Sequence, residues 1–315
     1  MHIVQVHHER LPVTKYGGAE RIVVWLCQAL VELGHQVTLV AAPGTRVDGV
    51  RVLPVDPKRL LAPDFDMSRH LSGGADIVHY HMPVRHTPAL PWVWTLHGNM
   101  GLEERAGPHT IAVSEDHARR HGIASFVHNG LRPDEYRFES HKGDYDLFIG
   151  RMHSAKGWQI AIAAAKRCRV RLVLAGGWRP DFSRYVRFVG RVGGDEKREL
   201  LAGARCLWMP VQWDEPFGLT AIEALISGTP VLGTPRGALP EIVTPETGGL
   251  APTLDGLVAL RGRLADWSPA AAHTRAERYF THRRMARDYL RMYEHLLTHG
   301  ELPPGRRADA LVTGR

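Results

Sequence analysis

Two glutamates in the stretch "DEPFGLTAIEALISGTPV" lie eight positions apart, on either side of an apolar turn. Glu215 comes directly before Pro-Phe-Gly, and Glu223 lies one turn inside a helix that we expect to begin near Leu219. Carboxylates accept hydrogen bonds from pairs of hydroxyl groups, which a sugar ring and a ribose both offer. The free N–H groups at the start of a helix bind anions such as a pyrophosphate. This arrangement predicts a site that holds both ends of a nucleotide sugar. The alternative is a helix-dipole acid beside an unrelated surface acid.

Arg151 and Lys156, in the stretch "FIGRMHSAKGW", offer the positive charge that such a site needs. Both follow an expected strand in the second half of the chain. A forked guanidinium and a compact ammonium each bind phosphate oxygens well. The pair is not a P-loop, because the G-x4-G-K pattern is absent. We expect both side chains to reach a diphosphate, although an ordinary surface pair has the same spacing.

Gly17 and Gly18 precede the first expected helix in "KYGGAER". Without side chains, their backbone allows a phosphate or an acceptor to approach closely. A purely structural turn is the alternative. The G-x-G-x-x-G fingerprint of nicotinamide-dinucleotide enzymes is absent here, which argues against that class.

Several other polar and aromatic residues resemble parts of known sites. His79 and His81 share one face of a strand and, with His97, imitate a zinc site, but the spacing shows no nearby third ligand. The D-x-D patterns at 64–66 and 144–146 are interpreted as loop acids, so no metal is expected. Three tryptophans near expected loops are interpreted as core side chains, with a place near a nucleotide base as the alternative for the second of them: Trp158, Trp178 and Trp213.

The elements that must position these residues alternate between strand and helix. "HIVQV" is a short apolar strand, and a helical stripe follows it until Gly34. Further strands are expected on to "SFVHN" at 125–129. The polar stretch at 129–146 has the composition of a linker, and a second alternating series follows it. Two open parallel sheets flanked by helices are therefore expected, with ligands beyond the carboxyl ends of the strands.

These patterns divide the chain into four parts. We expect an acceptor-side domain at 1–135, a nucleotide-sugar domain at 144–281, a helix at 282–298 that crosses back to the first domain, and a flexible tail at 299–315.

Composition and charge indicate the compartment and the kinds of partner that we expect for the protein. The 315 residues carry a formal net charge of +7 and include three scattered cysteines. No signal peptide and no apolar run long enough to cross a bilayer are seen, which favours a protein of the reducing cytoplasm. The basic residues are dispersed and no RNA-binding signature is present, so nucleic acid is not expected. Peripheral contact with an anionic membrane stays open.

Taken together, "YGGAER", "TLHG", "HNG", "GRMHSAKG", "LVLAGG", "RFVGRV" and "EPFGLTAIEALISGTPV…GALPEIV" resemble the family 4 glycosyltransferases, retaining enzymes of the GT-B architecture. The resemblance runs from residue 1 to about 297. It implies two Rossmann-like domains that face each other across a cleft. The catalytic residues that it implies are His97 near the sugar and acceptor, Arg151 and Lys156 at the diphosphate, and Glu215 at the donor hydroxyls. The donor-binding residues that it implies are Gly17, Gly18, Gly150, Phe217, Gly218, Leu219, Thr220 and, at the ribose, Glu223.

The resemblance also implies an activity. A sugar would move from a nucleotide diphosphate sugar, with a UDP-sugar favoured, to a hydroxyl of a small-molecule or glycan acceptor, with retention and without a cofactor. Front-face attack assisted by the leaving diphosphate is expected, and a covalent intermediate on Glu215 is the competing route. A nucleotide-sugar epimerase or a phosphorylase of the same architecture, and a non-catalytic sugar-nucleotide or glycan-binding protein, are the alternatives.

Overall fold

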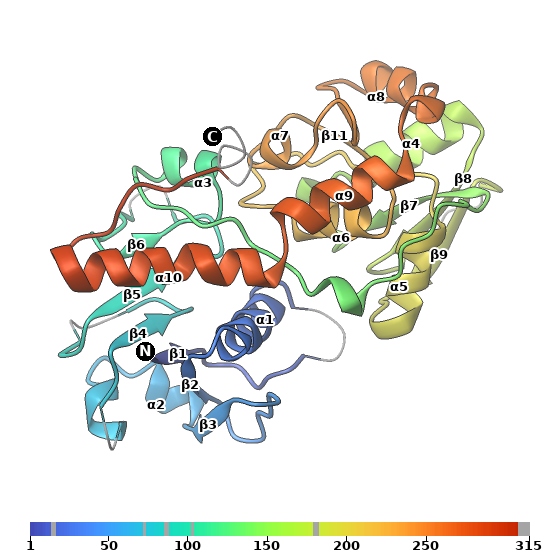
Figure 1. Ribbon diagram of the computed structural model, residues 1–315. Coiled ribbons are helices and arrows are strands. Elements are labelled where there is room, and N and C mark those ends of the chain that lie inside the picture. Colours follow the sequence, from blue (N-terminus) through green and yellow to red (C-terminus); the bar gives the residue numbers. More distant parts are fainter. Residues whose placement is uncertain (14–16, 72–73, 85–87, 102–103, 179–182, 308–315) are drawn as a thin grey trace. The chain divides into compact units, whose positions relative to one another are not determined.

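The computed structural model describes residues 1–13, 17–71, 74–84, 88–101, 104–178 and 183–307 (Figure 1). The chain forms two compact units. Unit 1 contains Met1–Leu131 and the chain from Thr281 on, and unit 2 contains Arg132–Phe280. Each unit is built around a six-stranded parallel sheet. This confirms the α/β class that the alternating pattern predicts.

The sheet of unit 1 has the order β3-β2-β1-β4-β5-β6. The chain therefore runs outward from β1 in one direction, returns, and continues on the other side of β1 through β4. The strands are β1 (His2–Val6), β2 (Gln36–Ala41), β3 (Arg51–Pro54), β4 (Ile77–Tyr80), β5 (Trp92–Thr95) and β6 (Thr110–Ile111). The segment 125–129 contributes only an isolated bridge between Phe126 and Ala112, so the strand expected there is wrong.

Helices cover both faces of this sheet. On one face, side chains of β1 and β4 join an apolar cluster with Leu60 of α2 (Pro57–Leu60), Met67 of the 3-10 helix η1 (Met67–His70) and Phe65 from the chain between them. The other face lies under α10 (His282–His299), which packs against α1 (Ala19–Glu32) and lies alongside the sheet in Figure 1. A further helix among the described residues of the unit is α3 (Glu115–Arg120). Burial on both faces explains why the central strands are apolar.

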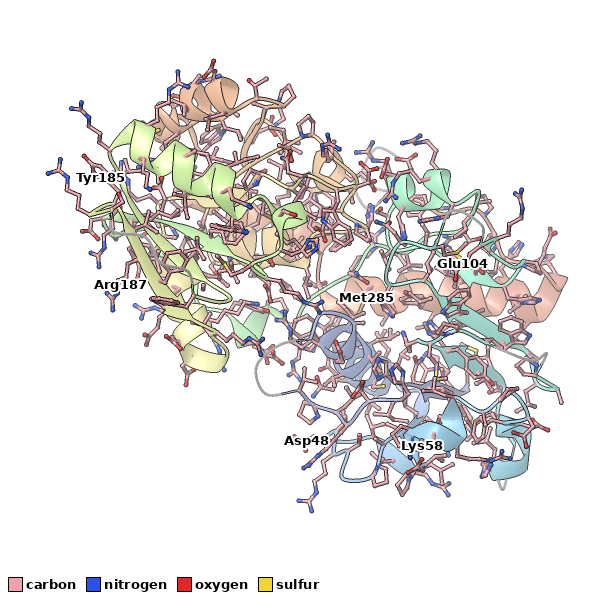
Figure 2. The ribbon with its side chains drawn as sticks, turned by 180° about the vertical axis from the view of Figure 1, so that it is seen from behind. Asp48, Lys58, Glu104, Tyr185, Arg187 and Met285 are labelled. Carbon is pink, nitrogen blue, oxygen red and sulfur yellow. The ribbon has the colours of Figure 1, made fainter. Side chains whose placement is uncertain are left out.

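The sheet of unit 2 has the order β12-β11-β10-β7-β8-β9, so its chain order reverses between β7 and β10. Tyr185 and Arg187 lie at its β9 edge (Figure 2). The strands are β7 (Tyr145–Ile149), β8 (Arg171–Ala175), β9 (Val186–Gly190), β10 (Leu207–Met209), β11 (Val231–Gly233) and β12 (Gly248–Leu250).

Helices of unit 2 form two groups. An apolar cluster joins the sheet to α4 (Trp158–Cys168) and α8 (Leu254–Arg261). A second group packs α6 (Leu219–Ile226) against α9 (Pro269–Tyr279) and α5 (Gly194–Gly203). The shorter elements are α7 (Leu239–Ile242) and the 3-10 helices η2 (Pro133–Glu135), η3 (Ser154–Lys156) and η4 (Leu264–Asp266).

Asp146 is a strand residue with no exposed surface, so its interpretation as a loop acid is wrong. Arg261 donates from Nε to Oδ2 of Asp146 at 2.6 Å, and Trp208 donates from Nε1 to the same oxygen at 3.1 Å. A buried carboxylate keeps its charge only beside such partners. Asp144 is exposed and pairs with Arg171 at 3.2 Å. Within the described ranges, no helix is both long enough and apolar enough to span a bilayer.

Candidate active site

A lysine, a glutamate and a tryptophan meet where β7 and β10 end. Lys156 Nζ lies 2.7 Å from Glu215 Oε2, and Trp213 Nε1 donates to the same oxygen at 2.8 Å. The Lys156 ammonium also lies 4.4 Å from the centroid of the Trp213 ring, within the range of a cation–π contact. Ligands of open parallel sheets bind beyond the strand ends where the chain order reverses, and β7 and β10 form that point in unit 2.

Glycines lock the loops that carry these side chains. Gly157 has a φ of 75°, and a Cβ there would lie 1.8 Å from the Pro210 carbonyl oxygen. The Gln212 N–H donates to the Ala155 carbonyl at 2.7 Å. The loop after β7 is therefore held directly against the loop after β10, which brings Lys156 to Glu215.

The backbone of Glu215 is fixed from a third loop, the one after β11. Gly237 has a φ of 59°, and a Cβ there would lie 2.2 Å from the Glu215 carbonyl oxygen. The Ala238 N–H donates to that oxygen at 2.9 Å. The Glu215 side chain is only 11% exposed, while the Lys156 side chain is 26% exposed. The Glu215 carboxylate is thus largely screened from water, while the Lys156 ammonium is accessible to a ligand.

The helix α6 begins at Leu219, as the sequence predicts. Gly218 caps it in the left-handed region with a φ of 99°, which favours glycine. Phe217 is buried and packs edge-on against Phe280, with ring centroids 6.0 Å apart. The first amides of the helix, including that of Thr220, therefore follow Glu215 by a few residues on a rigid support and suit an anion.

Glu223 takes part in a second ion pair. It has no exposed surface, and its Oε2 accepts from Lys197 Nζ at 2.6 Å while its Oε1 accepts from Tyr136 Oη at 2.7 Å. The structure therefore gives the two glutamates two different lysines. Sequence reasoning missed Lys197 and Tyr136, which lie 26 and 87 residues from Glu223 and carry no local motif. The role of Glu223 at a ribose stays a prediction.

Arg151 and Gly150 follow β7. The Gly150 N–H donates to the Ala175 carbonyl at 3.0 Å, and Gly176, with a φ of 125°, leaves no room for a Cβ against Gly150. The end of β7 is thus tied to the end of β8. Arg151 is exposed at this edge. Trp178, in the loop after β8, is 70% exposed, so its interpretation as a core side chain is wrong.

The remaining predicted residues belong to unit 1. Gly18 caps α1, and a Cβ on it would meet nothing within 4 Å. A Cβ on Gly17 would lie 2.6 Å from Val13 Cγ2, so that position is crowded. The Lys15 and Tyr16 part of the motif lies outside the described residues.

His97 follows β5, and its Nε2 lies 2.8 Å from His81 Nδ1. Burial, with smaller contributions from His7 and His117, lowers the pKa of His97 to about 3, so the ring is neutral. His79 bonds instead to Thr95 at 2.7 Å. In the part of the chain that the structure describes, no group of three or more His, Cys, Asp or Glu side chains is arranged to hold a metal ion.

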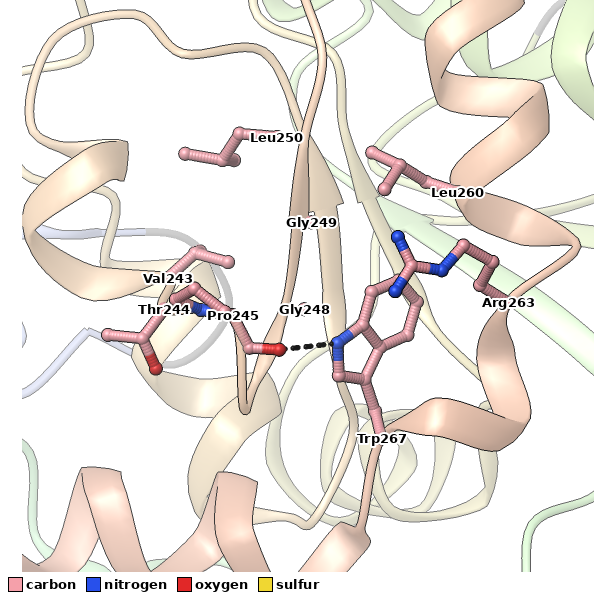
Figure 3. A pocket seen from close by; sticks show the side chains of 9 residues that line it. All are labelled: Val243, Thr244, Pro245, Gly248, Gly249, Leu250, Leu260, Arg263 and Trp267. Carbon is pink, nitrogen blue, oxygen red and sulfur yellow. Dashed lines mark hydrogen bonds between the residues drawn. The ribbon is translucent and has the colours of Figure 1, made fainter.

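A cavity of about 300 Å³ lies beside the edge strand β12 (Figure 3). Trp267 closes one side, with Nε1 donating to the Pro245 carbonyl at 2.9 Å. Its lining is mostly apolar and includes Arg263. Its lining residues come from β12, from the segment before it and from α8 and the chain that follows, and they include neither Lys156 nor Glu215.

Comparison with known proteins identifies the family of the chain. Residues 16–138 match the family model described as "Glycosyltransferase Family 4", and residues 144–265 match the model "Glycosyl transferases group 1". Among solved structures, AviGT4, a glycosyltransferase involved in avilamycin A biosynthesis, is 29% identical, with a TM-score of 0.82 over 96% of this chain and 99% of that one.

Other relatives are less identical to this chain than AviGT4, or match a smaller part of it. Glycogen synthase of Mycobacterium tuberculosis is 27% identical over 88% of each chain. An uncharacterised glycosyltransferase of Methanocaldococcus jannaschii is 30% identical over 39% of each chain. A GDP-mannose-dependent alpha-mannosyltransferase of Corynebacterium glutamicum is 26% identical over 54% of this chain and 45% of its own length. The chain is a member of the family 4 glycosyltransferases and has the GT-B fold.

Proposed function

We propose that this glycosyltransferase moves a sugar from a nucleotide diphosphate sugar, with a UDP-sugar favoured, to a hydroxyl of a small-molecule or glycan acceptor, with retention at the anomeric carbon. The observation that carries the proposal is the contact of Lys156, Trp213 and Glu215. It lies after the strands where the chain order reverses and a few residues before the start of α6. A cation, a carboxylate and helix amides are the groups that a diphosphate sugar requires.

The leaving group defines the role of the cations. As the bond between the anomeric carbon and the diphosphate oxygen breaks, negative charge grows on the phosphate. Lys156 and Arg151, with the first amides of α6, meet that charge from fixed positions, which is usually the largest contribution to catalysis. When the donor binds, the Lys156 ammonium leaves the Glu215 carboxylate and contacts a phosphate oxygen instead. Glu215 accepts hydrogen bonds from the donor-sugar hydroxyls.

Retention follows from attack on the face that the diphosphate leaves. The acceptor oxygen bonds to the anomeric carbon, and its proton passes to the departing phosphate oxygen. Glu215 suits this route better than it suits covalent attack. Its Oε2 accepts from the Trp213 indole N–H, and this bond, which remains when Lys156 turns to the phosphate, stabilises the carboxylate and weakens it as a nucleophile.

We expect no cofactor, and no divalent metal because the two cations of the β7 loop supply the charge. Transfer rates should therefore be the same with and without a chelator. The free cysteines Cys27, Cys168 and Cys206 support a reducing compartment such as the cytoplasm.

The test is a screen of UDP-, GDP- and ADP-sugars. A true donor stabilises the folded protein by mass action, so it should raise the melting temperature. The best donor is then incubated with candidate acceptors, and proton NMR of the product gives the anomeric configuration. Retained configuration supports the proposal. A well-folded protein that no sugar nucleotide stabilises, or a product with inverted configuration, overturns it. A sugar altered without any acceptor would instead identify an epimerase.

A further inference from the structure

A row of buried polar side chains crosses the sheet of unit 1 under α10. Gln5 of β1 pairs in register with His79 of β4, and neither side chain has exposed surface. His81 follows β4 on the same face, because alternate strand residues point the same way. Thr95 of β5 is equally buried. Tyr293 reaches this row from the second half of α10.

Hydrogen bonds join four of these residues into one path, which we call the relay: His97, His81, Gln5 and Tyr293. His97 Nε2 lies 2.8 Å from His81 Nδ1, and His81 Nε2 lies 2.6 Å from Gln5 Oε1. Gln5 Nε2 donates to Tyr293 Oη at 3.4 Å, and that oxygen lies 2.6 Å from His79 Nδ1. His97 is partly exposed, whereas Gln5 has no exposed surface. His97 is therefore the end of the relay that a substrate can touch.

The donor and the acceptor of each hydrogen bond between Gln5, His81 and His97 can be assigned. With its amide oriented as in the structure, Gln5 presents a carbonyl oxygen, which only accepts, so His81 Nε2 must carry the hydrogen. Burial keeps the pKa of His81 well below its ordinary value, so the ring is neutral and its Nδ1 carries none. That Nδ1 must then accept from His97 Nε2. The Nδ1 atom of neutral His97 is left as an acceptor.

We infer that Gln5, His81 and Tyr293 are positioning residues, which hold His97 in the Nε2–H tautomer so that its Nδ1 accepts a hydrogen bond from a hydroxyl of the sugar substrate. The inference rests on the proposed function, because it assigns His97 to a sugar. The relay itself is a property of unit 1 alone and is measurable without any substrate.

The tautomer matters for two chemical reasons. A sugar hydroxyl that donates to Nδ1 keeps its oxygen lone pairs for other donors, whereas the opposite tautomer would present an N–H to the same hydroxyl. A neutral ring also adds no positive charge at the hydroxyl that it binds. The relay selects the acceptor form before substrate binds, which is pre-organisation in the usual sense.

The direct test reads the tautomer by NMR of the full chain labelled with nitrogen-15 in histidine. Long-range proton–nitrogen spectra show which ring nitrogen of His97 carries the hydrogen. We expect Nε2–H in the wild type. Gln5→Met keeps the length of the side chain but removes the acceptor, so a mixture of tautomers is expected. His97 protonated at Nδ1 in the wild type, or unchanged in Gln5→Met, would overturn the inference.

A matched pair of variants separates the relay from simple loss of packing. Tyr293→Phe and Tyr80→Phe each remove one buried phenol hydroxyl from unit 1, but only the first lies on the relay. Tyr80 belongs to the apolar cluster on the opposite face, and its Oη has no hydrogen-bond partner among the described residues. The tautomer population of His97 should shift in Tyr293→Phe and stay that of the wild type in Tyr80→Phe. Equal shifts in both would mean that the relay does not set the tautomer.

Kinetics with the donor found in the screen complete the test. Gln5→Met should lower kcat by about 10-fold, the effect of about one hydrogen bond, with little change in KM for the donor. Tyr80→Phe should keep the wild-type kcat. If the wild type transfers no sugar, the proposed function fails while the NMR result still decides the relay. If transfer occurs and kcat in a folded Gln5→Met protein is unchanged, the assignment of His97 to the sugar fails.

Discussion

The Nζ atom of Lys156 and the Oε2 atom of Glu215 lie 2.7 Å apart, although 59 residues separate them in the chain. Their loops follow β7 and β10, neighbouring parallel strands whose carboxyl ends lie at the same edge of the sheet. The carboxylate holds the ammonium ready at the place where we assign the diphosphate.

Lys156→Met should lower kcat by about 100- to 1000-fold, because it removes a fixed charge from the leaving diphosphate. The variant should remain folded, since the Lys156 side chain is partly exposed. Lys58→Met is the control. Lys58 is an exposed lysine of α2 (Figure 2), and its replacement should leave kcat unchanged. Steady-state transfer assays measure both, and a near-native rate for Lys156→Met would contradict the assignment.

Trp213→Phe should lower kcat by roughly 3- to 10-fold, which is the effect of one hydrogen bond. Phenylalanine keeps an aromatic face for the Lys156 ammonium but loses the N–H that fixes Glu215 Oε2. The melting temperature should change little. Identical kinetics for Trp213→Phe and the wild type would show that the indole N–H has no part in orienting Glu215.

Lys197→Met should destabilise the protein by about 3–5 kcal/mol, because it removes the Lys197 ammonium from the fully buried Glu223 carboxylate. The double variant Lys197→Met, Glu223→Gln should recover much of that loss, since neither charge of the pair then remains. Urea unfolding measures the two free energies. A single variant as stable as the wild type would mean that Glu223 is not buried as a charge.

Acid should destabilise unit 1 through its buried histidines. Burial lowers the pKa of His7 to about 4, and burial also lowers the pKa of His117 to about 4. The unfolded rings titrate near 6.5, so between pH 6.5 and 4 the unfolded chain binds protons that the folded chain does not. This stability is fully present above pH 6.5 and is lost as the pH falls, by up to about 1.4 kcal/mol per pH unit for each such histidine.

Melting temperatures between pH 7.5 and 5 measure the effect. Above pH 5, carboxyl groups with ordinary pKa values stay ionised, so the histidines dominate the slope. His79→Gln removes one fully buried ring whose pKa lies well below its ordinary value. The variant should therefore take up about one proton fewer on unfolding, and its melting temperature should fall less steeply as the pH is lowered. A melting temperature that rises on acidification would contradict the account.

Much of the fold is predictable because its signals are local. Strand–helix alternation predicts both parallel sheets, and the Pro-Phe-Gly turn predicts the start of α6 at Leu219. The family resemblance places Lys156 and Glu215 in one site, and the structure brings their side chains into contact.

Contacts made by packing are not predictable in this way. Glu223 pairs with Lys197, and this contact depends on how α5 packs near α6. Tyr293 reaches Gln5 across 288 residues because α10 lies on the first sheet. Asp146 shows the same limit, since its position at a strand entrance gave no sign of the arginine of α8 that neutralises it.

The most direct test of the central claim is calorimetric titration of wild-type and Lys156→Met proteins with the nucleoside diphosphate whose sugar gives the largest thermal shift, and with the matching nucleoside. Loss of a charge-assisted contact should weaken binding of the diphosphate by about 10- to 100-fold and leave that of the nucleoside within about 2-fold. Equal affinities of the two proteins for the diphosphate, or an equal loss for the nucleoside, would show that Lys156 does not bind the diphosphate.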